Sequence, residues 1–494
     1  MEITSSSLTE SQMLTIIRDG LPPTNQPKKI IIFGVGMAGL VAGSLLKRAG
    51  HRVTIVEASE RLGGRVLTLR APFTDGHYLE AGAMRIPSTH QLTMAYIAKF
   101  GLPLNKFINS TPNDLLYVNG IKKRRWLYEQ QPDMLRFPVA PHEKGKSADA
   151  LALMAIGSLL DFIRQNPEQH WPLVIQEYDK YSMELFLRHN PLGASLSAAA
   201  VDKIKVMSGF EVFPELSFLE ILRDFILFSP ATLFYEISGG FGQLPQSFAP
   251  ELQENVLFHH KMTKISQRGP KIAISGINLA SSRSFQLKGD VAIVTVPFSV
   301  LQFVDVEPTS LFSFGKWKAI HQLHYVSATK IGLQFSRRFW EEEGLYGGQT
   351  ICDLPLRFAY YPSHGFQQPG GTILASYTWE DDALPWISMS HDEQIRQVLR
   401  QLAILFDEQV YRTFVTGVVH NWATQPFAAG GFALFKPLQE TELSAFLTAQ
   451  EGPVPLAGEH TSPQYHGWIQ GAIESGVRAA VQGHSTPRPR ASNA

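Results

Sequence analysis

The chain has 494 residues and a formal net charge of +0, because 44 basic side chains balance 44 acidic ones. Hydrophobic residues make up 44% and charged residues 18%, which is typical of a soluble globular protein. The length predicts about three domains. The charge balance argues against a nucleic acid or an anionic membrane as a partner recognised by bulk charge. The single cysteine, Cys352, excludes an intrachain disulfide and a thiolate zinc cluster.

The N-terminal segment Met1–Gly20 is polar and lacks the charged and apolar regions of a signal peptide. No uninterrupted apolar run approaches the ~18 residues that a membrane helix needs. We therefore expect a cytoplasmic protein with no membrane or nucleic-acid partner and no bound metal. We also expect a homodimer or a higher homo-oligomer.

The stretch Lys28–Arg65 predicts a strand, a glycine-rich turn, a helix and a second strand. Lys29–Phe33 is a short apolar run of the kind found in strands buried on both faces. Leu40–Ala49 is rich in Ala and Leu and is followed by Gly50, which predicts a helix with a glycine stop. Arg52–Glu57 predicts the second strand.

Three glycines in this stretch, Gly34, Gly36 and Gly39, have the G-x-G-x-x-G spacing. The first makes the tight turn, the second lets a pyrophosphate approach the backbone, and the third lets helix and strand pack closely. The helix N-terminus then faces the phosphates, and Glu57 is spaced to accept hydrogen bonds from a ribose. The alternative is a tight turn without a ligand, which the flanking strands, helix and acid make less favourable.

Immediately after this acid, Glu60–Arg65 reads E-R-L-G-G-R. Paired glycines allow close backbone approach, and the arginine can reach a diphosphate. This segment resembles the E-R-x-G-G-R of the flavin amine oxidases, and the resemblance implies FAD rather than NAD as the cofactor.

The C-terminal part predicts a second unit of strand, glycine-containing turn and helix. Val454–Ala457 predicts a strand, Gly458–Gly467 a turn and Ile469–Gln482 a helix. A second helix N-terminus of this kind suits a flavin, and the alternative is an ordinary capped helix. The segment resembles the A-G-E and H-G-W-I segments of L-amino acid oxidases. The resemblance spans about Lys28 to Gln482 and is weakest in a helical insertion.

The fold class we predict is α/β: an interrupted Rossmann-like FAD-binding domain of the two-dinucleotide-binding type, a mixed-sheet substrate-binding domain and a helical domain. The expected helices of the insertion are Ala148–Gln165, Pro172–Leu187, Ser195–Ser208 and Ser217–Phe228. The separate sheet is expected from Val326–Ser336, Phe358–Tyr361, Thr372–Trp379 and Val410–Trp422. The domains are an N-terminal extension (1–27), the FAD-binding domain (28–88, 234–300 and 452–483), the substrate-binding domain (89–146 and 301–451), the helical domain (147–233) and a disordered tail (484–494).

The expected cofactor contacts come from all three parts of the FAD-binding domain. They are Gly34, Gly36, Met37, Ala38, Gly39, Glu57, Ala58, Arg65, Gly82, Ala83, Met84, Arg85, Met262, Gly458, Glu459, Trp468, Ile469 and Ala472. Cys352 lies outside the C-terminal segment in which monoamine oxidases carry their cysteinyl linkage, so we expect FAD to be bound non-covalently.

Arg85 follows the small residues of Glu80–Met84 and is the candidate for the substrate carboxylate. A guanidinium matches a carboxylate with two parallel hydrogen bonds, which lysine does less well. The alternative is a structural ion pair. In L-amino acid oxidases the arginine of this A-G-A-M-R segment holds the substrate carboxylate, and this implies an amino acid rather than an amine as substrate.

Further catalytic and binding residues follow from the resemblance. It implies that Lys330 holds a water near flavin N5 and that the Tyr377 hydroxyl helps to bind the carboxylate. Trp468, beside Gly467, faces the amino-acid side of the flavin, and Trp422 adds a further wall. From residue type alone, Lys330 could equally lie on the exposed face of a strand, and Tyr377 could be a core aromatic.

Glu220 and Asp224 lie one helical turn apart and share a face. One hypothesis is that Asp224 favours cationic substrates such as arginine or lysine. A solvated helix face is the alternative. The aromatic residues of Phe225–Tyr235 favour bulky apolar or aromatic substrates instead, so broad specificity stays open.

Together these features predict an L-amino-acid oxidase that moves a hydride from Cα to flavin N5. The products would be a 2-oxo acid, ammonia and hydrogen peroxide, with O₂ as the second substrate. The alternatives are an amino-acid 2-monooxygenase, an amine or polyamine oxidase, and a flavin-binding protein without turnover.

Overall fold

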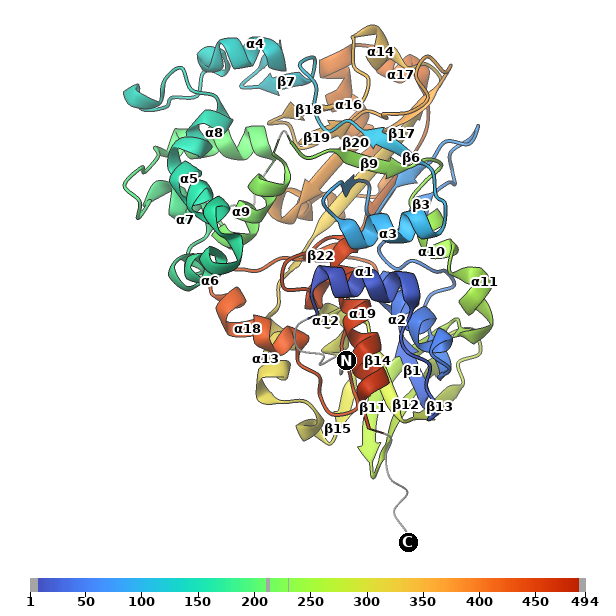
Figure 1. Ribbon diagram of the computed structural model, residues 1–494. Coiled ribbons are helices and arrows are strands. Elements are labelled where there is room, and N and C mark those ends of the chain that lie inside the picture. Colours follow the sequence, from blue (N-terminus) through green and yellow to red (C-terminus); the bar gives the residue numbers. More distant parts are fainter. Residues whose placement is uncertain (1–7, 210–213, 230, 488–494) are drawn as a thin grey trace.

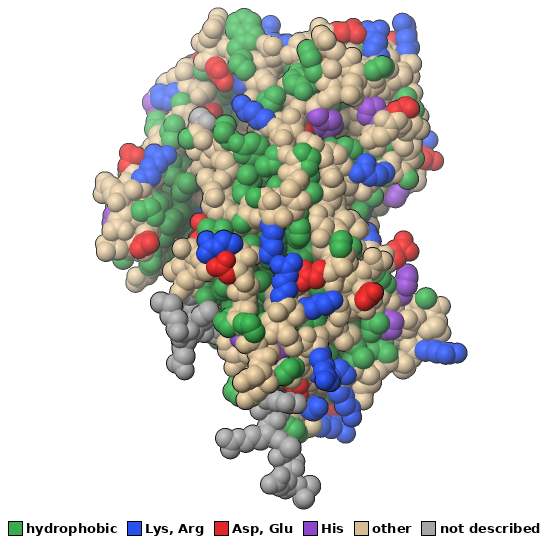
Figure 2. Space-filling model, turned by 45° about the vertical axis from the view of Figure 1, so that its right-hand side comes forward, with side chains coloured by type: hydrophobic (Ala, Val, Ile, Leu, Met, Phe, Trp, Pro, Cys, Tyr) green, Lys and Arg blue, Asp and Glu red, His purple; other side chains and the backbone are tan. Residues whose placement is uncertain are grey.

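The computed structural model describes residues 8–209, 214–229 and 231–487. Figure 1 shows a parallel sheet with its helices in one half of the molecule, a second large sheet in the other half, and a group of helices beside that second sheet. On the face in Figure 2, basic and acidic side chains are interspersed. No helix of the described residues combines the length and the apolar character that a membrane crossing requires.

The parallel sheet contains the predicted glycine-rich unit. Its strand order is β10-β2-β1-β14, with the bounds Val256–Leu257, Arg52–Val56, Lys29–Phe33 and Val291–Val294. All three pairings are parallel. Both faces of β1 are buried, which is why its sequence is a continuous apolar run. Helix α2 (Met37–Arg48) packs against helix α19 (Ile469–Ser485) and against this sheet.

The glycines of the first turn behave as their spacing predicts. Gly34 has a φ of +102°, which side chains rarely adopt. A Cβ on Gly39 would lie 2.0 Å from the Gly34 carbonyl oxygen, so helix and strand touch through this position. Helix α2 begins at Met37, three residues before the predicted start at Leu40.

The strand predicted at Val454–Ala457 forms only in part. Ala292 and Val294 of β14 donate backbone hydrogen bonds to the carbonyls of Pro453 and Pro455, and Leu456 forms an isolated parallel bridge with Val294. Prolines at 453 and 455 have no N–H to donate, and this explains why the ladder stays incomplete.

A seven-stranded mixed sheet forms the second large sheet, as predicted from its alternating segments. Its order is β21-β17-β20-β19-β18-β7-β8, with the bounds Phe414–Asn421, Ala328–Phe335, Gly371–Trp379, Phe358–Tyr360, Gln349–Cys352, Leu115–Val118 and Ile121–Arg124. The prediction of one strand over Val410–Trp422 was wrong at its start, because α17 (Gln409–Thr413) precedes β21.

The described residues of the helical region form five main helices rather than the four predicted. They are α5 (Ala148–Gln165), α6 (Pro167–Tyr178), α7 (Met183–Arg188), α8 (Ala198–Ser208) and α9 (Phe218–Leu227). The single helix expected over Pro172–Leu187 is split, because Ser182 caps the N-terminus of α7 with its side chain. Pro172 lies inside α6 instead of starting a helix.

Smaller elements connect these parts. The remaining sheets are β13-β12-β11-β15 (Ser284–Gly289, Lys271–Asn278, His260–Arg268, Asp305–Glu307), β5-β9-β6 (Ile86–Pro87, Phe234–Ile237, Leu104–Phe107), β3-β4 (Thr68–Leu69, Leu79–Glu80) and β16-β22 (Tyr325–Val326, Phe432–Ala433). Further helices include α1 (Glu10–Asp19), α3 (Gln91–Lys99), α12 (Phe298–Leu301), α13 (Phe314–Gln322), α16 (His391–Phe406) and α18 (Gln439–Thr448).

The predicted tail was wrong at its start, since α19 continues through Ser485 and residues 488–494 lie outside the described part. The predicted α/β class with a parallel nucleotide-type sheet, a mixed sheet and a helical region is confirmed. The domain boundaries stay a prediction.

We expect Gly39→Ala to lower the free energy of unfolding by at least about 2 kcal/mol, because its Cβ would overlap the Gly34 carbonyl. The matched control is Gly157→Ala in α5, where a Cβ meets nothing within 4 Å. That variant should gain roughly 1 kcal/mol from helix propensity. Urea unfolding followed by circular dichroism measures both, and an unchanged midpoint for Gly39→Ala would contradict the packing argument.

Candidate active site

A cavity of ≈ 1230 Å³ is lined by segments of the parallel sheet, the seven-stranded sheet and the helical region. Every predicted site residue except Gly39 lines it. They are Gly34, Gly36, Met37, Ala38, Glu57, Ala58, Arg65, Gly82, Ala83, Met84, Arg85, Glu220, Asp224, Met262, Lys330, Tyr377, Trp422, Gly458, Glu459, Gly467, Trp468, Ile469 and Ala472. Gly39 packs against the backbone of Gly34 instead.

Two long helices begin at this cavity without a side-chain cap. Gly36 is the N-cap of α2 and Trp468 is the N-cap of α19, and neither makes a side-chain capping hydrogen bond. The N–H groups of both first turns therefore remain available to a ligand, and both positive dipole ends favour negative charge. A Cβ on Gly36 would meet nothing within 4 Å, so the backbone is open to close approach there.

Glu57 follows β2 at the edge of the cavity. One carboxylate oxygen accepts a hydrogen bond of 3.0 Å from the Val35 N–H, and the other accepts one of 2.7 Å from the Ser59 N–H. These contacts fix the orientation of the carboxylate and leave lone pairs for hydroxyl donors. The arrangement can therefore hold a dinucleotide with a ribose at Glu57 and a diphosphate at the α2 N-terminus.

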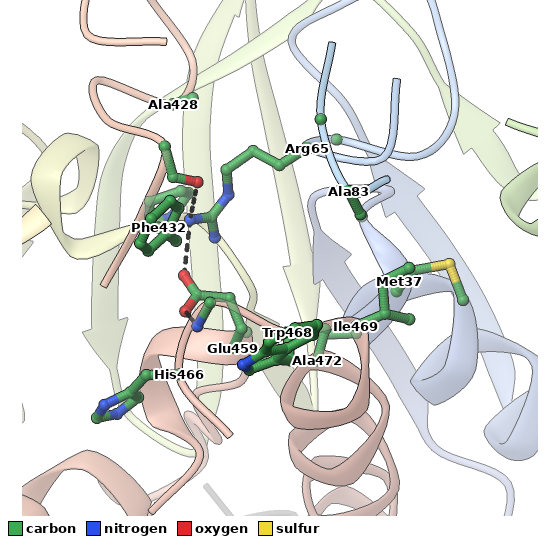
Figure 3. Close-up of a pocket in the computed structure, with 18 of the residues that line it drawn as sticks. Met37, Arg65, Ala83, Ala428, Phe432, Glu459, His466, Trp468, Ile469 and Ala472 are labelled. Carbon is green, nitrogen blue, oxygen red and sulfur yellow. Dashed lines mark hydrogen bonds and ion pairs between the residues drawn. The ribbon is translucent and has the colours of Figure 1, made fainter. Parts of the chain in front are cut away.

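Arg65 and Glu459 join the N-terminal and C-terminal parts of the chain across the cavity (Figure 3). Arg65 Nη1 lies 2.6 Å from Glu459 Oε1 and donates a second hydrogen bond of 3.2 Å to the Gly431 carbonyl. Glu459 Oε2 accepts a hydrogen bond of 2.7 Å from the Gly467 N–H. This ion pair fixes the turn that precedes Trp468.

Arg85 extends from the segment after β4 into an aromatic enclosure. Its Nη1 donates a hydrogen bond of 2.8 Å to Asn109 Oδ1. Its guanidinium carbon lies 4.6 Å from the ring centre of Phe228 and 5.7 Å from that of Tyr360. Sequence reasoning predicted Arg85 and placed Phe228 within the aromatic segment Phe225–Tyr235, but it missed Asn109 and Tyr360, since neither stands in a recognisable motif.

Lys330 is buried in β17, so the reading of an exposed strand lysine was wrong. Its Nζ donates to the Glu80 carbonyl at 3.1 Å and the Gly82 carbonyl at 2.6 Å, and it lies 3.4 Å from Met84 Sδ. Burial lowers the pKa of Lys330 to about 7. The amine is therefore tied to the same segment that carries Arg85.

Aromatic residues form the walls beside Lys330. Tyr377 faces Lys330 across the β17–β20 ladder, and Lys330 Nζ lies 4.7 Å from the Tyr377 ring centre. Burial raises the pKa of Tyr377 to about 12, so its hydroxyl stays protonated at neutral pH. The buried Trp422 donates a hydrogen bond of 2.8 Å from its indole nitrogen to the Ala81 carbonyl. Trp468 lies at the start of α19 (Figure 3).

The shared face of Glu220 and Asp224 on α9 is turned towards the cavity, so the solvated-face alternative was wrong. Glu220 Oε1 accepts hydrogen bonds from His466 Nδ1 at 2.7 Å and from the Phe435 N–H at 3.0 Å. Burial would by itself lower the pKa of His466, but the Glu220 carboxylate offsets this and raises it. Glu220 therefore already has a partner.

Asp224 differs from Glu220. Among the described residues its carboxyl group has no hydrogen-bond or ion-pair partner within the usual distances, and it is half-buried in the cavity wall. Burial, together with the nearby charge of Glu220, raises the pKa of Asp224 to about 7. His466, missed by sequence reasoning although it stands in the H-G-W-I segment, also lines the cavity, and its buried Nε2 has no partner in the described part of the chain.

Cys352 is buried at the end of β18 and does not line the cavity. Within residues 8–209, 214–229 and 231–487, no group of three or more His, Cys, Asp and Glu side chains is arranged to hold a metal ion.

Comparison with solved structures identifies proteins with a similar fold. A putrescine oxidase variant has a TM-score of 0.76 at 18% identity, covering 93% of this chain and 99% of that one. Cyclohexylamine oxidase from Brevibacterium oxydans has a TM-score of 0.72 at 20% identity, covering 93% and 98%. At these identities the likeness establishes the fold alone.

Sequence comparison identifies relatives with higher identity. The chain is 47% identical to the YobN protein of Bacillus subtilis (strain 168), covering 98% of this chain and 100% of that one. It is 38% identical to an L-amino-acid oxidase of Siganus canaliculatus, covering 95% and 88%, and 35% identical to an L-amino-acid oxidase of Echis ocellatus, covering 95% and 91%. The model of the flavin containing amine oxidoreductases matches residues 37–482. The chain therefore belongs to the flavin containing amine oxidoreductase family and is an enzyme of the L-amino-acid oxidase type.

Proposed function

We propose that this enzyme oxidises free L-amino acids with FAD and O₂, giving the 2-oxo acid, ammonia and hydrogen peroxide. One observation carries the proposal: the Arg85 guanidinium lines the cavity with a neutral amide as its hydrogen-bond partner and an aromatic ring on its face. Such a guanidinium keeps its charge for an anionic group of the substrate. The L-amino-acid oxidases among the relatives support the same substrate class.

The residues of the cavity suit FAD. The uncapped N-termini of α2 and α19 would hold its diphosphate and the polar edge of its ring, and Glu57 would hold a ribose. When bound, FAD supplies the hydride acceptor and passes the electrons to O₂. Cys352 lies outside the cavity lining, which supports non-covalent binding.

The chain's own residues have positioning roles. Arg85 would bind the substrate carboxylate, and Tyr377 would add a hydrogen bond from its protonated hydroxyl. Tyr377 and Trp468 would bracket the amine and Cα, with Trp422 as a further wall, which would exclude water and fix the carbon that loses hydride. Little acid–base machinery is needed once the substrate amine is neutral.

Lys330 is the candidate for holding a water beside the reacting atoms. With its pKa lowered to about 7 by burial, a large fraction of Lys330 is neutral at physiological pH. A neutral amine keeps two donors and gains one lone pair. It could therefore stay attached to the 80–84 segment and accept a hydrogen bond from water.

The alternatives make different products or none. An amino-acid 2-monooxygenase would give the amide and CO₂ in place of the 2-oxo acid, ammonia and peroxide. An amine or polyamine oxidase would turn over decarboxylated substrates and would not need Arg85. A flavin-binding protein without turnover would be reduced by no amino acid.

Anaerobic titration of the purified holoenzyme tests the proposal against these alternatives. We expect L-amino acids to bleach the flavin absorbance and their decarboxylated amines to leave it unchanged, because only the former carry a carboxylate for Arg85. Product analysis after admission of O₂ should find 2-oxo acid, ammonia and peroxide. Bleaching by the amines but not by the amino acids would overturn the proposal.

We expect Arg85→Ala to raise KM for L-amino acids about 100-fold or more, because a bidentate charge-assisted pair is lost. Arg85→Lys is the matched variant and should recover part of this loss, since a lysine retains the charge but not the fork geometry. Steady-state peroxide formation measures both. Equal KM values for Arg85→Ala and the parent enzyme would exclude Arg85 as the carboxylate site.

The unpartnered Asp224 predicts a pH-dependent substrate preference. Because its pKa is raised to about 7, the carboxyl is neutral below pH 7 and negatively charged above it. We therefore expect the ratio of kcat/KM for L-Arg to that for L-Leu to rise about 10-fold between pH 6 and pH 8. Titration of the α-amino group affects both substrates and largely cancels in this ratio.

Asp224→Asn is the control and should make the ratio independent of pH over that range. A ratio that stays flat in the parent enzyme, or one that rises equally in Asp224→Asn, would refute a role of Asp224 in selecting cationic side chains. In that case the aromatic residues around Phe228 would favour bulky apolar substrates.

A further inference from the structure

Four arginines line the cavity, and their partners differ: Arg61 donates only to backbone carbonyls, among them that of Gly64 at 2.6 Å. Arg65 pairs with Glu459 at 2.6 Å, and Arg223 on α9 pairs with Glu440 on α18. Arg85 instead donates to the side-chain oxygen of Asn109 at 2.8 Å, and no carboxylate of the described residues lies within 4.0 Å of it. Arg85 is thus oriented by a neutral group rather than by a carboxylate in direct contact.

Asn109 itself does not line the cavity. It follows β6, and its predecessor Ile108 is held on both sides: the Ile108 N–H donates to Ser363 Oγ at 2.9 Å, and the Ile108 carbonyl accepts from the Gly348 N–H at 2.8 Å. Gly348 and Ser363 flank the segment that contains β18 and β19. The seven-stranded sheet therefore fixes the loop that presents the Asn109 amide.

The other sides of Arg85 are also restricted. Phe228 covers its guanidinium at 4.6 Å, and Phe234 of β9 lies 6.0 Å from it. β9 pairs with β6, and Phe234 stands opposite Phe107, two residues before Asn109. With one edge bound to Asn109 and one face covered by Phe228, the remaining N–H groups point in a restricted direction. Only a guanidinium held in one orientation can offer two parallel donors to a carboxylate.

We propose that Asn109 is a positioning residue that fixes the Arg85 guanidinium for a substrate carboxylate and so determines the preference for carboxylate-bearing ligands. This inference rests on the proposed function. A neutral amide suits the role, because an aspartate in its place would bind Arg85 more strongly and cancel the charge that the substrate needs. The residue acts through Arg85 and not by contact with the substrate.

The test uses the FAD-loaded enzyme and two readouts. The first is kcat and KM for L-Leu. The second is the dissociation constant of benzoate, followed by its perturbation of the flavin absorbance, with benzyl alcohol as the counterpart without a carboxylate. We expect Asn109→Ala to raise KM and the benzoate dissociation constant about 10-fold while kcat and benzyl alcohol binding change less than about 2-fold. Asn109→Asp should weaken benzoate binding by a further 10-fold or more.

Asn113→Ala is the matched control. Asn113 lies in the same loop, is exposed, and donates to the Gly344 carbonyl at 3.2 Å, away from Arg85. It should leave all constants unchanged. In an Arg85→Ala background, Asn109→Ala should add no further loss of benzoate affinity, because the group that it orients is gone.

The inference is overturned if Asn109→Ala lowers the melting temperature or kcat without changing KM and benzoate affinity, or if Asn109→Asp binds benzoate as tightly as the parent enzyme. These results leave the proposed function intact as long as Arg85→Ala still abolishes benzoate binding. If Arg85→Ala has no effect on benzoate or L-Leu, the carboxylate site itself is wrong and both proposals fail together.

Discussion

Close packing of the C-terminal helix α19 on the first helix α2 is the constraint on which the site depends. A Cβ on Gly476 would lie 2.7 Å from the Ala38 carbonyl, and a Cβ on Gly471 would lie 2.3 Å from the Tyr465 carbonyl. Only glycine permits these approaches. The approach of Gly476 to Ala38 brings the two ends of the chain together, so that two uncapped helix N-termini open into one cavity. The approach of Gly471 to Tyr465 packs the preceding turn against α19.

The charged side chains of this cavity differ in whether they have a partner. A buried charge is costly unless it is paired, and Arg65 and Arg223 have carboxylate partners from distant segments. These pairs hold the cavity walls together. Arg61 and Lys330 are held by backbone carbonyls, whereas Arg85 contacts only a neutral amide and Asp224 has no hydrogen-bond or ion-pair partner among the described residues; both face the space where a ligand would lie. Groups without a compensating partner mark the places where the ligand supplies one.

Features of the fold and of the site that depend on a local sequence pattern could be predicted. The glycine spacing, the E-R-x-G-G-R and H-G-W-I segments and the apolar periodicity identified the nucleotide sheet, the mixed sheet and most cavity residues. The sequence could not predict contacts that depend on register or on loops. Lys330 meets Tyr377 only because β17 and β20 pair in one register, and Asn109 reaches Arg85 only because Ile108 is anchored to another sheet. The segment Val454–Ala457 predicted a strand, but the prolines at 453 and 455 lack the N–H groups that a complete ladder needs.

The ionisable groups around Arg85 are coupled to its charge. The positive charge of Arg85 adds to burial in lowering the pKa of Lys330, and it opposes burial by lowering the pKa of Asp224. In the proposed complex the substrate carboxylate would offset the charge of Arg85 and so raise both pKa values, whereas the substrate ammonium would oppose this rise. In the proposed reaction the substrate ammonium would lose a proton before hydride leaves Cα. Because these groups interact, the apparent pKa values of the proposed turnover would belong to the coupled set rather than to one residue.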